Sequence, residues 1–100
     1  MIFYSWVALN RSERSFPGLD DLAALREEAP VALGITDDRG RAMMEGEQTL
    51  ETGRATAVLI EAVRPAMAAR TLTSCYVRTG VVWLGGRAPD GEIAWSRFFF

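Results

Sequence analysis

Proline and glycine divide the chain into short segments, and this limits its fold more than any other feature of the sequence. Breaks fall at Pro17 and Gly18, at Pro30, at Pro65 and at the turn-forming residues 88–91. Proline removes a backbone donor and disfavours the α conformation of the residue before it, and glycine suits tight turns. The 100 residues suit one domain, spanning 1–100, rather than two. We therefore expect one small domain built from several short strands and helices.

The first half predicts a strand, a helix and a hairpin. Residues 2–9 are rich in aromatic and β-branched side chains on both alternations, which favours a strand covered on both faces. Residues 19–29 carry acids in the first turn and leucines at helical spacing, which indicates a short helix. Residues 31–36 and 41–48 are expected to form two strands joined by the Asp-Asp-Arg-Gly turn at 37–40.

A second, longer helix is expected to begin at Thr49 as its N-cap. Its apolar residues recur at the spacing of one helix face, and they are Ala55, Val58, Leu59, Ala62, Val63 and Ala66. Pro65 is expected to kink or end this helix, and residues 66–70 could continue it.

The chain is expected to close with three strands at residues 71–78, 81–86 and 92–100, the last two joined by the turn at 88–91. For residues 71–78 a continuation of the helix is the alternative. The fold class is therefore α+β, with a mostly antiparallel sheet of five to six strands and two helices packed on one face. The expected order is β-α-β-β-α-β-β-β.

The residue inventory removes most catalytic chemistry. The chain has 11 basic residues, all arginine, with no lysine, no histidine and a single cysteine, Cys75. This excludes, within one chain, histidine-based triads, Schiff-base lysines, disulfides and cysteine zinc sites. We expect no catalysis, no cofactor and no metal. Glu61 with Arg64, or Glu92 with Arg97, are the nominal acid–arginine pairs for carboxylate chemistry.

The expected location is the cytoplasm. A lone cysteine suits a reducing compartment, and residues 1–9 lack the basic region and cleavage pattern of a signal peptide. No apolar run approaches the roughly 20 residues that span a bilayer. The exclusive use of arginine indicates a GC-rich genome, and hence a bacterium or its phage.

Four acids of the expected hairpin form a candidate binding group: Asp37, Asp38, Glu45 and Glu47. Residues two apart on a strand share a face, so Glu45 and Glu47 are expected to point the same way. Their spacing fits no calcium loop. They are either solvated surface and turn formers or an acidic face that steers a basic partner.

The last strand brings a second candidate group, Trp95, Phe98, Phe99 and Phe100. Consecutive strand residues face opposite sides, so at least one phenylalanine points away from a one-sided core. Burying such a ring is worth roughly 2–3 kcal/mol. We expect burial against a twin subunit or a partner protein, with burial inside the chain as the alternative.

Together these features favour a small non-catalytic protein-binding module of bacterial or phage type. Inhibitors, antitoxins or immunity proteins, assembly adaptors and anti-defence inhibitors belong to this class. The alternative is a homodimer that binds a small ligand, or catalyses with carboxylates, at the subunit interface. Nucleic acid is a less favoured partner, because the net charge is −2 and the arginines are scattered. It would require Arg11, Arg14, Arg39 and Arg41 to gather in space.

Overall fold

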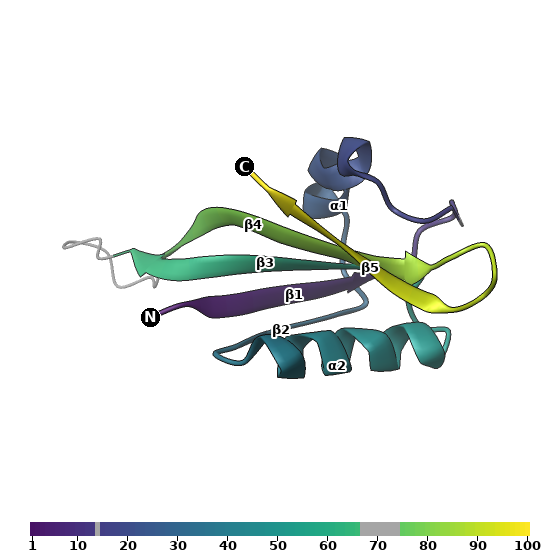
Figure 1. The fold of residues 1–100 in the computed structure, drawn as a ribbon, viewed down its shortest axis with the longest axis horizontal. Coiled ribbons are helices and arrows are strands. Elements are labelled where there is room, and N and C mark those ends of the chain that lie inside the picture. Colours follow the sequence, from purple (N-terminus) through teal and green to yellow (C-terminus); the bar gives the residue numbers. More distant parts are fainter. Residues whose placement is uncertain (14, 67–74) are drawn as a thin grey trace.

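A computed structural model describes residues 1–13, 15–66 and 75–100. The described part of the chain contains five strands, two α-helices and one short 3₁₀ turn, η1, and Figure 1 shows how the strands and α-helices are arranged. Their bounds are β1 Phe3–Leu9, η1 Leu19–Asp21, α1 Leu22–Glu27, β2 Ala32–Thr36, α2 Arg39–Glu51, β3 Ala57–Ala66, β4 Cys75–Arg87 and β5 Ile93–Phe99.

The five strands form one sheet in the order β2-β1-β3-β4-β5, and every neighbouring pair is antiparallel. The prediction of an α+β fold with an antiparallel sheet and two helices is confirmed. The two-sided first strand is also confirmed. Val7 and Leu9 pack on the α1 side, whereas Tyr4, Trp6 and Ala8 pack on the α2 side.

The two helices cover opposite faces of the sheet, so the prediction that both lie on one face was wrong. Figure 1 shows α1 above the sheet and α2 below it. The reason lies in β3, which is apolar on both faces: Leu59 contacts the leucines of α1, and Val58 and Ile60 contact the core under α2. A strand that is apolar on both faces needs a cover on each side.

Residues 41–48, expected to be a strand, belong to α2. Asp38 acts as the N-cap of this helix rather than as a hairpin residue, and its Oδ1 accepts a hydrogen bond of 3.3 Å from the Arg41 N–H. Asp suits both a tight turn and an N-cap, so the same residue supports either interpretation. Thr49, expected to start the next helix, is buried inside α2. The buried residues of α2 recur at helical spacing, and they are Ala42, Gly46, Thr49 and Leu50.

The expected long helix is the strand β3. Every residue from Ala57 to Val63 is buried, which is the continuous pattern of a strand covered on both faces. A short apolar run of this kind matches helical spacing by coincidence. Pro65 does not kink a helix; it lies near the end of β3, opposite Tyr76.

The remaining expectations concern the final strands. Residues 67–74 lie outside the described residues, so the possible helical continuation and the first part of the strand expected at 71–78 fall there. Cys75 to Arg78 are strand, and β4 runs on through 81–86 as one element with a register shift opposite Glu61 and Val63. No helix in the described ranges is long and apolar enough to cross a membrane.

Candidate binding surface

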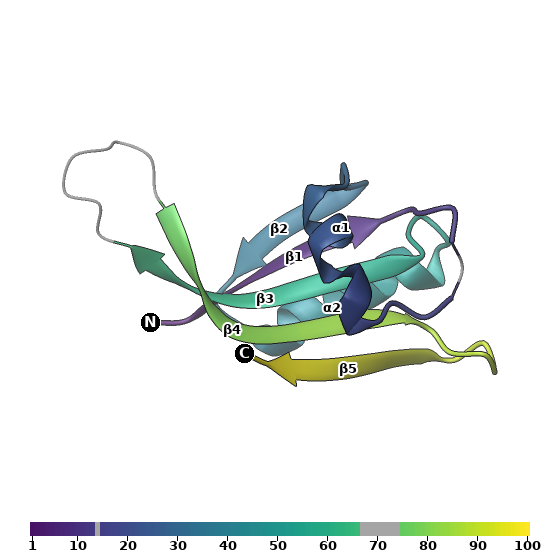
Figure 2. The same ribbon diagram turned by 90° about the horizontal axis from the view of Figure 1, so that it is seen from above.

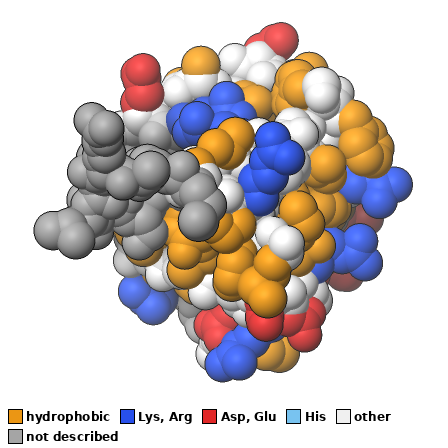
Figure 3. Space-filling view, turned by 90° about the vertical axis from the view of Figure 1, so that its left-hand side faces the viewer, with side chains coloured by type: hydrophobic (Ala, Val, Ile, Leu, Met, Phe, Trp, Pro, Cys, Tyr) orange, Lys and Arg blue, Asp and Glu red, His pale blue; other side chains and the backbone are white. Residues whose placement is uncertain are grey.

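One end of the sheet carries most of the exposed apolar side chains. β1 and β4 begin at this end, β3 and β5 finish there, and Figure 2 shows both chain termini beside it. We call this surface the open end. Among the described residues its exposed large apolar side chains are Met1, Ile2, Tyr76, Val77, Phe99 and Phe100. Figure 3 looks onto this end and shows hydrophobic side chains, with basic ones among them, over its middle and acidic ones along the border beside α2.

The open end is exposed because neither helix reaches far enough to cover it. The helix α1 has only six residues, and its Leu22 and Leu25 contact Leu9, Leu59 and neighbouring side chains toward the opposite end. Figure 2 shows α1 lying across the half of the sheet away from the termini. The sequence therefore builds a core under each helix and leaves the other half of the α1 face open.

The last two phenylalanines have fixed backbones and exposed rings. Phe99 pairs with Val81 in the sheet, and the Phe100 N–H donates to the Gly80 carbonyl at 2.8 Å. The rings are nevertheless 67% and 68% exposed. The Arg97 guanidinium lies 4.9 Å from the centre of the Phe99 ring, a cation–π contact that orients this ring.

The other two aromatic candidates pack inside the chain. Phe98 is half-buried against the α1-side core, and Trp95 is half-buried against the α2-side core. The Trp95 Nε1–H donates to the Glu47 carboxylate at 2.8 Å. A Cβ on Gly85 would lie 2.5 Å from the indole ring, so only glycine leaves room for it there. For these two side chains the alternative of burial within the chain describes the structure.

The four acids separate into two places. Asp37 and Asp38 follow β2, whose last residue pairs with Tyr4 of β1, so they border the open end. Glu45 and Glu47 lie on α2, and the expectation that they share a face was wrong. Residues two apart in a helix point in opposite directions. Glu45 lines a groove beside Trp6, whereas Glu47 bonds Trp95.

A buried acid in β3 forms the shortest ionic contacts that the structure describes. Glu61 is 7% exposed and accepts hydrogen bonds of 3.0 and 2.8 Å from Arg26 of α1. Nε of Arg78 in β4 forms an ion pair with the same carboxylate at 2.9 Å. The hydrogen bonds to Glu61, together with its opposite charge, raise the pKa of Arg26 above its ordinary value although partial burial opposes this.

The sequence indicated Glu61 as a candidate but with the wrong partner. No ion pair joins Glu61 to Arg64, or Glu92 to Arg97, within the described ranges. The true partners come from elements far away in the sequence. The signal that could have identified them is the single charge inside the apolar run of β3, because a buried charge requires a partner. This cluster holds α1 against the sheet and places Arg78 at the border of the open end.

The arginines considered for nucleic acid do not share one surface. Arg11 is buried and lies 3.6 Å from Asp21 and 3.8 Å from Glu13. Arg39 lies at the start of α2, at the opposite end of the sheet from Arg11. Arg14 lies outside the described residues.

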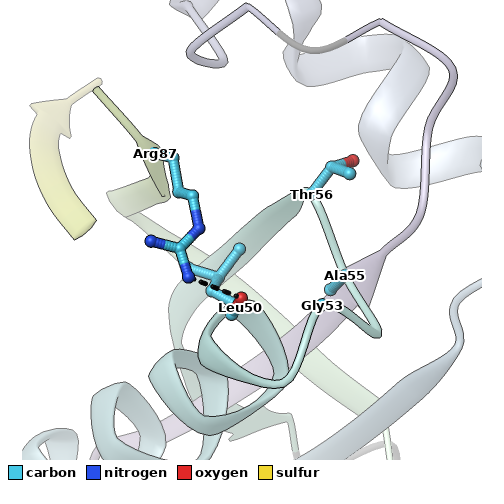
Figure 4. A pocket seen from close by; sticks show the side chains of 5 residues that line it. All are labelled: Leu50, Gly53, Ala55, Thr56 and Arg87. Atoms are coloured by element: carbon cyan, nitrogen blue, oxygen red, sulfur yellow. Dashed lines mark hydrogen bonds between the residues drawn. The ribbon is translucent and has the colours of Figure 1, made fainter. Parts of the chain in front are cut away.

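Several hollows lie along α2. A groove of about 410 Å³ separates its first half from β2 and is lined by Trp6, Gly34, Ile35, Thr36, Arg41 and Glu45. A pocket of about 150 Å³ lies at its last turn, and Figure 4 shows the residues that line it. There the Arg87 guanidinium donates to the Leu50 carbonyl at 3.3 Å, so this arginine caps the end of the helix. Across the described residues, no group of three or more cysteine or acidic side chains is placed to hold a metal ion.

Comparisons with protein-family models, with curated proteins and with solved structures find no match to this chain. Its function must be inferred from its own surfaces.

Proposed function

We propose that this chain is a small non-catalytic protein-binding module that captures a partner protein at the open end. One observation carries the proposal: the Phe99 and Phe100 rings are about two-thirds exposed while their backbones are fixed to β4. A ring held in place but open to water loses little conformational freedom when a partner covers it.

The energetics favour a protein partner with an apolar surface. Burying each ring contributes roughly 2–3 kcal/mol, and a few aromatic anchors of this kind carry most of the affinity of protein interfaces. Tyr76 and Val77 are also exposed at the open end. Asp37 and Asp38 at its border would accelerate the encounter with a basic partner.

Within this class the roles of inhibitor, antitoxin or immunity protein, and assembly adaptor all require such a surface. We place the module in the cytoplasm of a bacterium or of a phage-infected cell, on the sequence composition described above. An anti-defence inhibitor is one concrete form, in which the acids face a nucleic-acid-binding enzyme.

The test compares affinity capture by the native chain and by the double variant Phe99→Ser/Phe100→Ser. The proposal predicts that the native chain retains a partner of defined mass and that the double variant loses it while its melting temperature changes little. Leu19→Ser is the matched control, because Leu19 is also exposed but belongs to η1 near α1.

Retention of the same partner by the double variant would refute the proposal. A large fall in the melting temperature of the double variant would also count against it, because the rings would then belong to the fold.

A further inference from the structure

The edge strand β2 lacks the features that usually protect an exposed edge. It runs Ala-Leu-Gly-Ile-Thr, with no charge and no proline, and Leu33 and Ile35 are 66% and 47% exposed. Edge strands of soluble monomers are usually guarded by charges, prolines, bulges or a covering segment. The opposite edge, β5, carries Arg97. By these criteria β2 is the less protected of the two edges.

We propose that β2 pairs antiparallel with β2 of a second copy of this chain, around a two-fold axis at Gly34. The two five-stranded sheets then join into one. In this register Leu33 of each protomer lies opposite Ile35 of the other, on the face where Leu33 is paired with Val7. The four side chains form one apolar cluster, and cross-strand pairs of this kind stabilise a sheet.

The other face of β2 is also suited to a two-fold axis at Gly34. The Trp6 indole lies across this glycine, and a Cβ there would be 2.6 Å from Trp6 Nε1. Gly34 therefore leaves the centre of the strand without a side chain that could clash with the same position of the second copy. The groove of about 410 Å³ between β2 and α2 opens beside it.

Charge complementarity identifies the occupant as a second copy rather than a different protein. Arg41 and Glu45 line the same groove as Gly34 and Thr36, and Glu45 also lines a hollow with Ala32, so an axis at Gly34 would pass between the two charges. α2 contacts β1 more than any other strand. In the joined sheet the order across the axis would be β1-β2-β2-β1, which separates β1 from its copy by three strand spacings of about 4.8 Å. The two α2 helices, each lying over its own β1, would therefore run antiparallel about 14 Å apart.

A two-fold axis places Arg41 of one protomer beside Glu45 of its partner, twice. Within the described residues no ion pair joins Arg41 to Glu45 inside one protomer, so both charges are available to the copy. The β2 edge adjoins the open end, since Ile35 and Tyr76 line the same hollow, but the pairing does not rest on the proposed function.

Sedimentation velocity over a concentration series tests the pairing. We expect the native chain to form a dimer and Leu33→Lys to raise its dissociation constant by at least about tenfold, because two lysines would meet the apolar cluster. Leu19→Lys is the control of matched chemistry at an exposed site away from β2, and it should leave the constant unchanged.

A charge exchange gives the sharper readout. Arg41→Glu and Glu45→Arg should each weaken the dimer, and the double exchange should restore it, because the pairs reform with the charges reversed. Both variants change exposed or half-buried side chains of α2, and circular dichroism checks that the helix persists.

The proposal is overturned if the native chain stays monomeric throughout the series. It is equally overturned if a dimer forms that Leu33→Lys does not weaken, or if the double exchange is no stronger than the single variants.

Discussion

At the scale of single residues, Glu61 shows how a charge can be placed inside a thin sheet. Its two carboxylate oxygens accept two hydrogen bonds from Arg26 and form an ion pair with Arg78, which leaves little of its charge unpaired. These arginines come from α1 and β4, so the contact ties the smaller helix to the sheet. Breaking such a cluster leaves buried or half-buried charges without partners.

The first prediction concerns Glu61→Gln. We expect this change to lower the free energy of unfolding by about 2 kcal/mol, less than for a fully buried pair because water screens the exposed part of Arg78. Urea denaturation measures the loss. Glu51→Gln, an exposed acid at the end of α2, is the control and should change stability by less than about 0.5 kcal/mol. Equal effects of the two changes would contradict the account.

The pH dependence of the cluster follows from the raised pKa of Arg26. A base whose pKa is raised by folding contributes stability that is fully present below its unfolded pKa and is lost as the pH rises through the folded value. The contribution of Arg26 should therefore persist through neutral pH and disappear only in strongly alkaline solution.

At the scale of elements, the ends of segments were easier to predict than their type. The breaks at Pro30 and at residues 88–91 do separate elements of the structure. Residues 41–48 and 55–63 were assigned the wrong type because local patterns were ambiguous: Asp38 suits a turn or a cap, and a continuous apolar run suits a helix or a buried strand. Tertiary packing decides both cases, since β3 is covered on two faces and α2 on one.

The N-cap of α2 gives the prediction at this scale. Asp38→Ala should lower the free energy of unfolding by about 1 kcal/mol and speed amide exchange at Arg41, because the Arg41 N–H loses its acceptor. Denaturation and hydrogen exchange measure the two effects. Asp37→Ala, the adjacent exposed acid, is the control and should change stability by less than about 0.5 kcal/mol. A larger loss for Asp37→Ala would show that Asp38 does not cap the helix.

At the scale of the whole molecule, the chain covers one half of its sheet better than the other. The six residues of α1 are too few to span the α1 face, so the open end and the β2 edge remain bare. The sequence predicted that at least one of the three terminal phenylalanines is exposed, because strand alternation sends consecutive side chains to opposite faces, and the structure exposes Phe99 and Phe100. It could not predict that Trp95 and Phe98 pack inside, because this depends on Gly85 and on α1, both distant in the sequence.

The central claim is that the open end is where a partner binds, and hydroxyl-radical footprinting of the free and the captured protein tests it most directly. Met1, Tyr76, Phe99 and Phe100 are reactive, exposed side chains of this surface, and Met44 on α2 is an exposed reference outside it. The account predicts that oxidation of the four falls in the complex while that of Met44 is unchanged. Full oxidation of Phe99 and Phe100 in a saturated complex would contradict it.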